Sequence, residues 1–559
     1  MAFRPLRVLE LADILSFDFK TGPVPKFHDG WCIGDPVDAV LSTTSSLLAI
    51  VDVQGSRVIQ FSHFSVKEFL TSARLAETND IICRRYHISM TPAHTLAAKA
   101  CLGILLHLDK TAVTRDTLVE KYPLAEYAAE YWVGHARFEG VSENVEDGMK
   151  RLFDPSEPHL AIWVWIYDPL LPPWIQIWQR EMPLHLRGSP LHYAAACGLP
   201  GIVKSLVIQD PQNLHSRCID DDSAPLHLAS RQGHEDVARL LLEHGADITA
   251  QTKDGETPVH VAMQRESDVL ALLLLEHGAD VTARTKDGTT PLHLASQQGR
   301  EKVVRWLLEH GADAKVKTNN GITPLHMAVE WSRDVIALLL LEHGADATAQ
   351  IEDGKTPLHL ASQRGREKVA RSLLEHGTDV TARTKYGETP LYLAVQWEHD
   401  VVARLLLEHG ADAITQVEDG NTPLHLASQR GREEVARLLL EHGADVTTQT
   451  KDGETPLHLA VQWDCDVVAR LLLEHGADAT ARTNDGKTPL HLVSREEVAR
   501  LLLEYGADST AQARDGVTPL FVALDRGLED LTRLLLEHGA DVTAKTDDGY
   551  TPLHLASEY

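Results

Sequence analysis

One short phrase, most often Thr-Pro-Leu-His, returns along this chain of 559 residues at a nearly constant interval. Eight consecutive steps between its prolines, from Pro225 to Pro489, are 33 residues long. A fixed period of about 20–50 residues indicates a tandem array of one supersecondary unit, so this interval constrains the fold more than any other feature. The prolines of the phrase are Pro190, Pro225, Pro258, Pro291, Pro324, Pro357, Pro390, Pro423, Pro456, Pro489, Pro519 and Pro552.

The unit that begins at Thr290 shows how each repeat is expected to fold. Thr290 can act as a helix N-cap, and Pro291 suits the first helical position, where its missing N–H removes no hydrogen bond. Gly299 ends this first helix, and residues 303–308 place apolar side chains on one face of a second helix that ends at Gly311. Isolated helices shorter than about 12–15 residues are marginal in water. The repeats must therefore bury their apolar faces against their neighbours in a stacked solenoid.

The period and the phrase resemble those of the ankyrin-repeat family, over about two thirds of the chain. The resemblance implies a mostly α fold: an ankyrin solenoid of helix-turn-helix and β-hairpin units over residues 184–559, with about 11 full repeats and a truncated twelfth. The tenth step, from Pro489 to Pro519, is only 30 residues, because residues 493–496 omit the Gln-Arg-Gly turn of the regular repeats. We predict a local distortion there. The chain stops within a first helix, which we interpret as truncation.

The charge is concentrated on the repeats. The formal net charge is −28; residues 1–180 contain 17 Lys/Arg and 22 Asp/Glu, a net charge of −5, and the remaining −23 lies on residues 181–559. Such an acidic surface repels nucleic acid and anionic membranes, and it favours a protein partner with a basic or apolar surface. The pattern makes no prediction of oligomeric state.

Cysteine usage and hydropathy indicate a cytoplasmic protein. No apolar run reaches 18 residues, so no membrane span is predicted. The scattered cysteines form no C-x-x-C pair, which argues against a zinc site or a disulfide framework and favours a reducing compartment. They are Cys32, Cys83, Cys101, Cys197, Cys218 and Cys465.

Residues 1–90 are expected to form the end of a larger domain. A helical stripe at residues 8–15, a helix running into a strand over residues 41–52, a second strand at residues 56–61 and a helix that starts over residues 62–70 suggest a winged-helix arrangement. Residues 4–12 (RPLRVLELA) and 61–70 (FSHFSVKEFL) resemble the region after the nucleotide-binding core of fungal NACHT–ankyrin proteins, which are NLR-like signalling NTPases of the STAND class. The resemblance implies a NACHT module ahead of residue 1. His63 then lies where a nucleotide-contacting histidine could be, although a locally packed helix-start histidine is the favoured interpretation.

No G-x-x-x-x-G-K-[ST] phosphate loop occurs in the chain. The triplets Gly-Lys-Thr at residues 354–356 and 486–488 lack the required upstream glycine, which is replaced by Ala349 and Ala481, and both triplets fall in hairpin turns. Without a phosphate cradle, no enzymatic activity and no cofactor are expected.

Residues 91–183 are predicted to be a helical connector. Helices are expected at residues 92–108, 123–138, 144–153 and 157–166. Trp163, Trp165, Trp174 and Trp178 crowd its junction with the first repeat. They could form an aromatic ligand site, but we favour a seal over the open end of the solenoid.

Most of the 30 histidines occupy two fixed slots of the repeat, such as His293 and His310. In the ankyrin family that the chain resembles, the first of these histidines hydrogen-bonds into the neighbouring turn, so the resemblance implies a structural ladder rather than a metal site, and no metal is expected. The pair of Glu309 and Asp313 likewise recurs without a nearby nucleophile, and a solvated face explains it.

The residue before the inter-helix turn is Gln232, Arg265 and Gln298 in three early repeats and then alternates between tryptophan and arginine from Trp331 to Trp463, with the three tryptophans 66 residues apart. In ankyrin proteins the first helices and hairpin tips line the concave groove, where Trp and Arg would act as binding hot spots. Alternatively, the Trp was copied by duplication of a two-repeat segment and packs locally or on arginine. The candidate partner-binding residues are Arg265, Trp331, Arg364, Trp397, Arg430, Trp463 and Arg526.

Three functions follow from these observations. The leading hypothesis is a non-catalytic scaffold or sensor that binds a protein on the concave ankyrin surface. The alternative is a truncated NLR-like signalling NTPase whose nucleotide-binding module lies upstream of residue 1. A third, an adaptor for protein degradation, lacks a recognisable docking motif.

Overall fold

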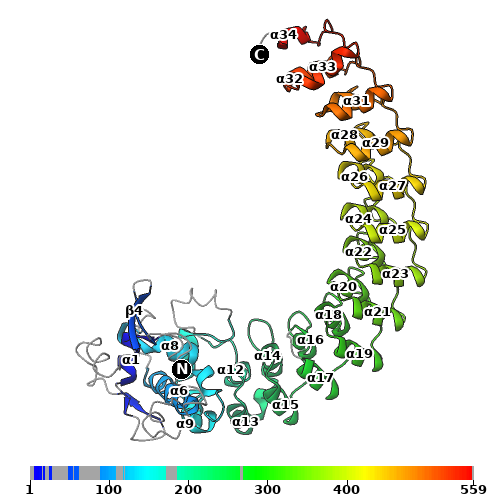
Figure 1. The fold of residues 1–559 in the computed structure, drawn as a ribbon. Helices are drawn as coiled ribbons and strands as arrows, with labels where there is room; N and C mark the ends of the chain where they lie inside the picture. Colours follow the sequence, from blue (N-terminus) through cyan, green and yellow to red (C-terminus); the bar gives the residue numbers. More distant parts are fainter. Residues whose placement is uncertain are drawn as a thin grey trace, which may run out of the picture. The chain divides into compact units, whose positions relative to one another are not determined.

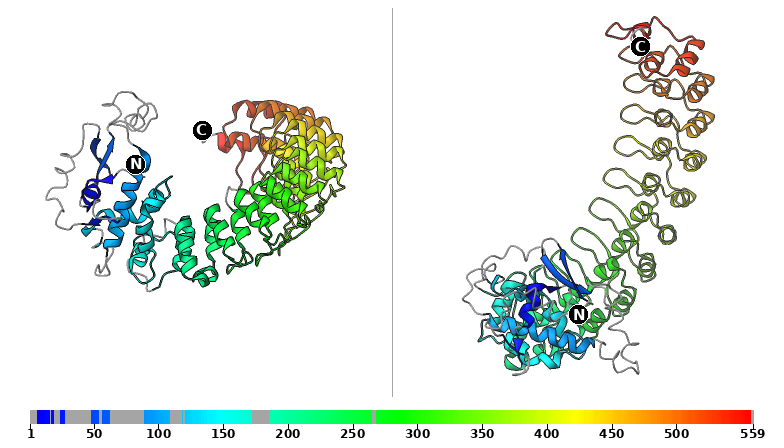
Figure 2. Two further views of the ribbon diagram at one scale, coloured as in Figure 1. Left: turned by 90° about the horizontal axis from the view of Figure 1, so that it is seen from below. Right: turned by 60° about the vertical axis from the view of Figure 1, so that its left-hand side comes forward.

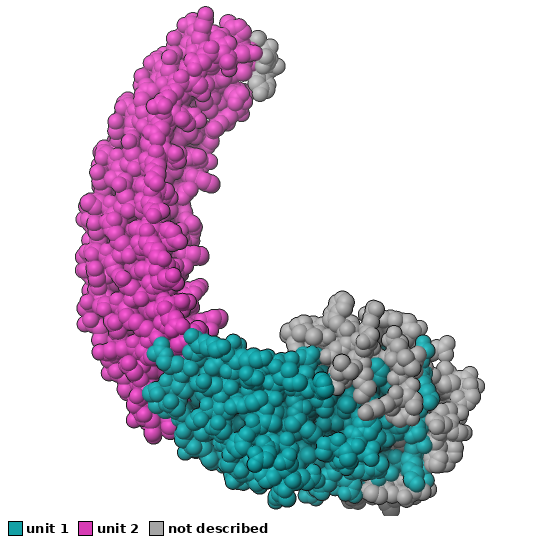
Figure 3. All heavy atoms as spheres, turned by 180° about the vertical axis from the view of Figure 1, so that it is seen from behind, with its two compact units in different colours: residues 1–286 teal, residues 287–559 magenta. Residues whose placement is uncertain are grey.

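A computed structural model gives the fold of residues 6–15, 17–18, 24–27, 48–53, 56–61, 89–108, 118, 120–171, 185–264 and 268–556. The chain divides into two compact units (Figure 3). Unit 1 is Met1–Lys286 and unit 2 is Asp287–Tyr559. No helix within the described ranges combines the length and the hydropathy needed to cross a membrane.

Unit 1 begins with short strands around one helix. Strand β1 (Leu6–Arg7) leads into α1 (Val8–Leu15), and β2 (Phe17–Asp18) pairs antiparallel with β3 (Lys26–Phe27). The hairpin of β4 (Leu48–Val53) and β5 (Ser56–Phe61) adds β1 to form an antiparallel sheet in the order β1-β5-β4. The helix predicted at residues 8–15 and both predicted strands are confirmed. The helix predicted at the start of residues 41–52 and the helix predicted at residues 62–70, with His63, lie outside the described residues.

The helical part of unit 1 matches the predicted connector helices closely. They are α6 (Met90–His107), α8 (Leu124–Ala136), α9 (Ser142–Leu152) and α10 (His159–Ile166). Alanines 98, 100, 128 and 129 are buried, which allows α6 and α8 to pack closely.

Trp163 of α10 occupies the centre of this helical part. Its side chain is 1% exposed, and its Nε1 donates to the carbonyl of Ala129 over 2.8 Å. Its ring packs edge-to-face against Trp132 at 5.2 Å and Tyr193 at 6.5 Å between ring centroids. Because Tyr193 belongs to the first repeat, Trp163 seals that repeat against the connector, as predicted. Trp165 is buried as well, and Trp174 and Trp178 lie outside the described residues.

The first repeats complete unit 1. Their helices are α12 (Pro190–Cys197), α13 (Pro200–Gln209), α14 (Pro225–Gln232), α15 (Glu235–Glu243), α16 (Pro258–Met263) and α17 (Asp268–Glu276), with a 3-10 turn η2 (Pro211–His215). The turn η2 occupies the place where the regular repeats have Glu-His-Gly-Ala-Asp.

Unit 2 consists of paired antiparallel helices. Its first helices are α18 (Pro291–Gln298), α20 (Pro324–Glu330), α22 (Pro357–Gln363), α24 (Pro390–Gln396), α26 (Pro423–Gln429), α28 (Pro456–Gln462), α30 (Pro489–Leu492), α32 (Pro519–Asp525) and α34 (Pro552–Ala556). Its second helices are α19 (Glu301–Glu309), α21 (Asp334–Glu342), α23 (Glu367–Glu375), α25 (Asp400–Glu408), α27 (Glu433–Glu441), α29 (Asp466–Glu474), α31 (Glu496–Glu504) and α33 (Glu529–Glu537).

The helices of unit 2 form two rows. Figure 1 shows the first helices along one side of the unit and the second helices along the other, and the views of Figure 2 show the same rows. Each first helix contacts the next first helix, and each second helix contacts the next second helix. Leu325, Leu340 and Leu358 are fully buried between these rows. The result is a curved, elongated body (Figure 3), in which stability comes from contacts between neighbours.

Turns join successive repeats of unit 2 along a third line of contacts. Gly288 has a φ of +84°, which glycine adopts without a Cβ clash. The backbone N–H of Asn319 donates to the carbonyl of Asp287 over 2.8 Å, and that of Lys385 donates to Asp353 over 2.9 Å. These bonds connect each hairpin turn to the next one.

The shortened repeat is distorted as predicted. Helix α30 has four residues, whereas the corresponding helices α22 and α26 have seven. Its C-cap Val493 is extended, with φ −65° and ψ 138°, because the chain has no Gln-Arg-Gly to form the usual turn.

Candidate functional site

The three regularly spaced tryptophans of unit 2 occupy one structural position. Trp331, Trp397 and Trp463 are the C-caps of α20, α24 and α28. Their exposed fractions are 53%, 52% and 56%. An apolar ring of this size buries 150–250 Å² when it packs, so repeated exposure is costly unless a partner covers it. We call the residues Trp331, Arg364, Trp397, Arg430 and Trp463 the tryptophan edge.

This edge lies at the turn between the two helices of each repeat. The N-cap threonine and the hairpin are at the other end of the first helix, and seven residues of helix span about 10 Å. The candidate side chains therefore follow the C-terminal ends of the first-helix row, away from the hairpin tips.

The residue after each tryptophan adopts a left-handed backbone conformation. Ser332, Glu398 and Asp464 have φ values of +59°, +64° and +54°. In the repeats of unit 2 that have arginine instead of tryptophan, this position is glycine, as at Gly365 and Gly431. A non-glycine residue there costs roughly 1–2 kcal/mol. Backbone strain of this kind is found most often at functional sites, where a particular side chain is needed although its left-handed conformation costs free energy.

Two of these left-handed residues use their side chains. Glu398 accepts from Arg430 over 3.1 Å and from Arg432 over 3.0 Å. Asp464 accepts a hydrogen bond from the hydroxyl of Ser494. In both cases the donor belongs to the next repeat, so the strained residue links neighbouring repeats.

Within the tryptophan edge, each repeat with arginine before the inter-helix turn (an Arg-type repeat) follows a repeat with tryptophan there (a Trp-type repeat). Arginines of the Arg-type repeat form ion pairs with acidic residues of the preceding Trp-type repeat. Arg364 pairs with Glu330, and Arg366 forms two bonds of 2.7 Å with Asp334. Arg432 likewise pairs with Asp400 at 2.6 Å. These pairs fix the arginine side chains along the edge.

The opposite junction, from the preceding repeat into a repeat that carries tryptophan, uses a different contact. His399 Nε2 donates to the carbonyl of Gln363 over 3.1 Å, and Arg333 Nε donates to that of Gln297 over 3.2 Å. A Cβ at Gly365 would lie 2.5 Å from His399 Nδ1. The glycine of the Arg-type repeat therefore makes room for the side chain that packs over it.

A shallow depression lies at the middle of the edge. It has a volume of 340 Å³ and is lined by Gln396, Trp397, Glu398 and Arg430. The exposed indole thus adjoins a carboxylate and a guanidinium that are already paired with one another. This combination can receive a flat or charged side chain of another protein.

The two remaining candidate residues, Arg265 and Arg526, are not part of the tryptophan edge. Arg526 is the exposed C-cap of α32. Arg265 lies outside the described residues. The alternation predicted that tryptophans and arginines share one position, but the roles of Glu398 and Asp464 were missed. The signal that could have found them is that each tryptophan of unit 2 is followed by a non-glycine residue (Ser332, Glu398 or Asp464), whereas Arg364 and Arg430 are followed by glycine.

The histidines of the Thr-Pro-Leu-His phrase form the predicted structural ladder. The N–H of Thr290 donates to Nδ1 of the buried His293 over 3.2 Å, so Nε2 carries the proton and donates to the carbonyl of Ile322 over 3.0 Å. Burial lowers the pKa of His359 and His425 to about 4, which keeps both neutral at pH 7. Among the described residues, no group of three or more His, Cys, Asp or Glu side chains is arranged to hold a metal ion.

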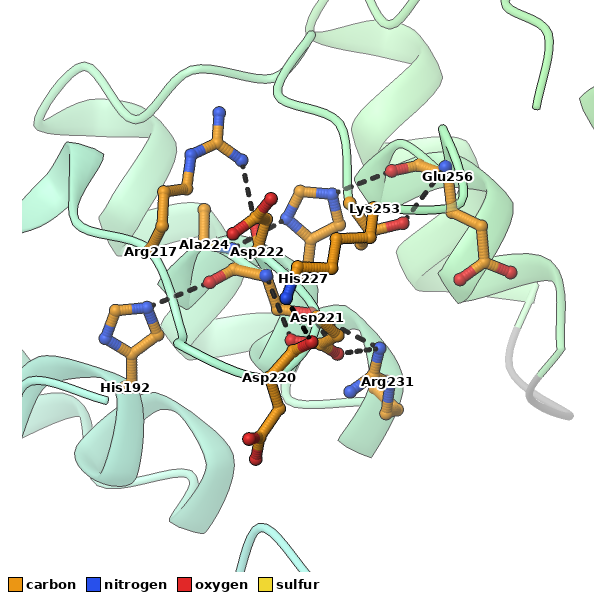
Figure 4. A network of polar contacts seen from close by, with 12 residues as sticks. His192, Arg217, Asp220, Asp221, Asp222, Ala224, His227, Arg231, Lys253 and Glu256 are labelled. Atoms are coloured by element: carbon orange, nitrogen blue, oxygen red, sulfur yellow. Dashed lines mark hydrogen bonds and ion pairs between the residues drawn. The ribbon is translucent and has the colours of Figure 1, made fainter. Parts of the chain in front are cut away.

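The same ladder appears in unit 1, where it joins a polar network (Figure 4). His192 Nε2 donates to the carbonyl of Ser223, and His227 Nε2 donates to that of Glu256, each over 3.0 Å. Asp221 accepts from the hydroxyl of Ser223 and pairs with Arg231 at 3.2 Å. The network holds the hairpin turn between two repeats.

Two known proteins are similar to parts of this chain. A chain from Monascus ruber, the azaphilone pigments biosynthesis cluster protein L, is 28% identical over 259 residues, which cover 44% of this chain and 53% of that protein. This chain thus matches about half the length of that relative. The crystal structure of the ankyrin repeat domain of Bcl-3, a member of the IkappaB family, is 33% identical, is fully covered, and covers 39% of this chain, with a TM-score of 0.36.

The family profile described as "Ankyrin repeats (3 copies)" matches overlapping segments that together run from residue 191 to residue 559. These matches span more than half of the chain and coincide with the paired helices of both units. The chain therefore belongs to the ankyrin-repeat family.

Proposed function

We propose that this chain is a non-catalytic scaffold or sensor that binds another protein through the tryptophan edge of its ankyrin array. The observation that supports the proposal best is the recurrence of an exposed tryptophan on a strained turn at Trp331, Trp397 and Trp463. Packing within the array leaves about half of each indole uncovered, whereas Trp and Arg are the residue types enriched at binding hot spots. Binding at this edge uses the first-helix row rather than the hairpin tips.

The edge is suited to a long partner. Two repeats separate successive tryptophans, and helices packed side by side are 8–10 Å apart, so the anchors recur at roughly 20 Å. A partner that contacts two or three of them gains from a high effective concentration after the first contact. A single short loop would reach only one anchor.

The test compares matched variants of the whole chain. The triple variant Trp331→Ala, Trp397→Ala, Trp463→Ala is used beside wild type to capture partners from an extract, with quantitative mass spectrometry as the readout. Tyr386→Ala, which removes an exposed aromatic side chain from a hairpin, is the control for the hairpin surface. The proposal requires a protein that is retained by wild type and Tyr386→Ala but lost by the triple variant. If the partner protein is lost by the Tyr386→Ala variant and retained by the triple variant, the binding site lies on the hairpins and the proposal is wrong.

The alternative function is that of an NLR-like signalling NTPase of the NACHT–ankyrin type. The antiparallel sheet β1-β5-β4 beside α1 supports it, because a helix followed by a β-hairpin is the arrangement expected from the winged-helix resemblance. In this alternative, residues 1–90 follow a nucleotide-binding core, residues 91–183 connect them, and residues 184–559 act as the sensor. Equilibrium binding of labelled ATP to the purified chain tests it, and measurable saturable binding would count against the pure scaffold.

We also propose a cytoplasmic location. Cys101, Cys197, Cys218 and Cys465 are free, and the first three are buried. Buried free thiols are compatible with a reducing compartment. Fractionation of cells that produce the tagged chain checks this location.

A further inference from the structure

The last tryptophan of the edge differs from the other two in its neighbours. At Trp331 and Trp397, the adjacent glutamates Glu330 and Glu398 are each paired with an arginine of the next repeat, Arg364 or Arg430. These arginines belong to the Gln-Arg-Gly turn. The next repeat after Trp463 is the shortened one, which lacks this turn.

The missing arginine changes the electrostatics at Trp463. Asp464 occupies the position of Glu398 and keeps the strained φ of +54°, but among the described residues its carboxylate meets only the hydroxyl of Ser494 and no cation. Arg495, which aligns with Arg432, reaches Asp466 through one oxygen only. The other oxygen, Oδ1 of Asp466, is buried without a hydrogen-bond partner in the described part of the chain. The carboxylates of Asp464 and Asp466, one and three residues after the exposed Trp463, are thus incompletely paired.

Cation–π stacking and a carboxylate contact favour the same kind of ligand. A guanidinium is attracted to the face of Trp and forms charge-assisted bonds with Asp, and arginine combines both better than lysine because it is planar. The net charge of −23 on the repeats steers a basic segment toward this surface and repels a second copy of the acidic chain.

We propose that the protein partner places an arginine side chain against Trp463 and Asp464, where it replaces the arginine that the shortened repeat lacks. The guanidinium stacks on the exposed indole and pairs with the carboxylate of Asp464. Trp331 and Trp397 then act as anchors without this charge preference. The inference rests on the proposed function, because it assigns the chemistry of one end of the same edge.

The probe is a fluorescein-labelled peptide, Gly-Arg repeated four times, with a matched peptide in which citrulline replaces arginine. Anisotropy titrations use the whole chain. Wild type is expected to bind the arginine peptide at least about fivefold more tightly than the citrulline peptide. Trp463→Ala and Asp464→Asn are each expected to weaken arginine-peptide binding by about fivefold. Tyr386→Ala and Glu418→Gln, which remove an exposed aromatic ring and an exposed carboxylate from the hairpins, are controls expected to stay within about twofold of wild type.

A further variant separates site loss from misfolding. Inserting Gln-Arg-Gly between Ser494 and Arg495 restores the 33-residue length and supplies the pairing arginine from within the chain. This variant is expected to have a higher thermal stability than wild type. It is also expected to bind the arginine peptide as weakly as the Asp464→Asn variant does. Equal binding by all variants, or by both peptides, overturns the inference. If that happens while the triple tryptophan variant still loses its partner, the proposed function stands and only the arginine assignment fails.

Discussion

The guanidinium of Arg366 meets the carboxylate of Asp334 through two parallel hydrogen bonds of 2.7 Å, although the residues are 32 positions apart. The side chains are only 30% and 26% exposed. The pair joins the second helices of two repeats, so it stabilises the interface between them rather than either repeat. Because partly buried bidentate pairs are stronger than exposed ones, its contribution should be measurable.

A double-mutant cycle with Arg366→Gln and Asp334→Asn should give a coupling free energy of unfolding of about 1–1.5 kcal/mol. The control is the pair Arg371–Glu367, which lies within α23 at 3.0 Å and is about half exposed. Its coupling should be about 0.3–0.5 kcal/mol and should fall further with added salt. Equal couplings from urea unfolding would show that the inter-repeat pair has no special role.

Substitution of a glycine in an Arg-type turn by alanine should lower the free energy of unfolding more than the same substitution of a glycine that ends a second helix. Gly365→Ala places a Cβ against the ring of His399 and also strains a φ of +66°, so we expect a loss of about 2–3 kcal/mol in the free energy of unfolding. Gly377→Ala strains a similar φ of +74° but meets open space, so about 1 kcal/mol is expected. Chemical denaturation of both variants compares them directly, and equal losses would exclude the proposed packing over Gly365.

Replacement of Ser332 by glycine should stabilise the chain. Ser332 has a φ of +59°, and none of the side-chain contacts found in the described residues involves its hydroxyl. Glycine removes the left-handed strain, which we expect to raise the free energy of unfolding by up to about 1 kcal/mol. In contrast, Glu398→Gly should be neutral or destabilising, because it also removes two ion pairs. A destabilised Ser332→Gly variant would argue against strain at this turn.

The sequence predicted the repeat length, the helix bounds and the distortion at residues 493–496, because each depends on local rules for caps, glycines and apolar periodicity. It also placed Trp331, Trp397 and Trp463 at one position of the repeat. It missed the pairing of Glu398 with Arg430, because that contact exists only once the repeats are stacked. The positive φ of Glu398 could not be predicted either, because non-glycine residues rarely adopt the left-handed region and the sequence does not mark those that do.

Acidification should destabilise the array through its buried histidines. Burial lowers the pKa of His359, His425 and His458 from 6.5 to about 4. Between pH 6.5 and 4 the unfolded chain binds protons that the folded chain does not, so stability is present above pH 6.5 and is lost as the pH falls through this window. The urea midpoint should therefore decrease steadily from pH 7 to pH 5.

The variant His359→Tyr tests the origin of this pH dependence. Tyr392 already occupies the same slot in another repeat and is buried there, so the substitution should be tolerated. It removes one titrating group and should reduce the pH slope of the unfolding free energy by up to about 1.4 kcal/mol per pH unit. An unchanged slope would locate the proton uptake elsewhere.

Trp397→Ala should separate binding from folding more cleanly than any other single change on the edge. The side chain is 52% exposed and caps α24 through its backbone, which alanine retains, so we expect the free energy of unfolding to change by less than about 0.5 kcal/mol. Affinity for the protein partner should fall by roughly 2 kcal/mol or more if the indole is a hot spot. Calorimetric titration of wild type and variant with the captured partner measures this difference. Unchanged affinity, with the fold intact, would leave the duplicated tryptophan as a by-product of repeat copying and would exclude Trp397 from the interface.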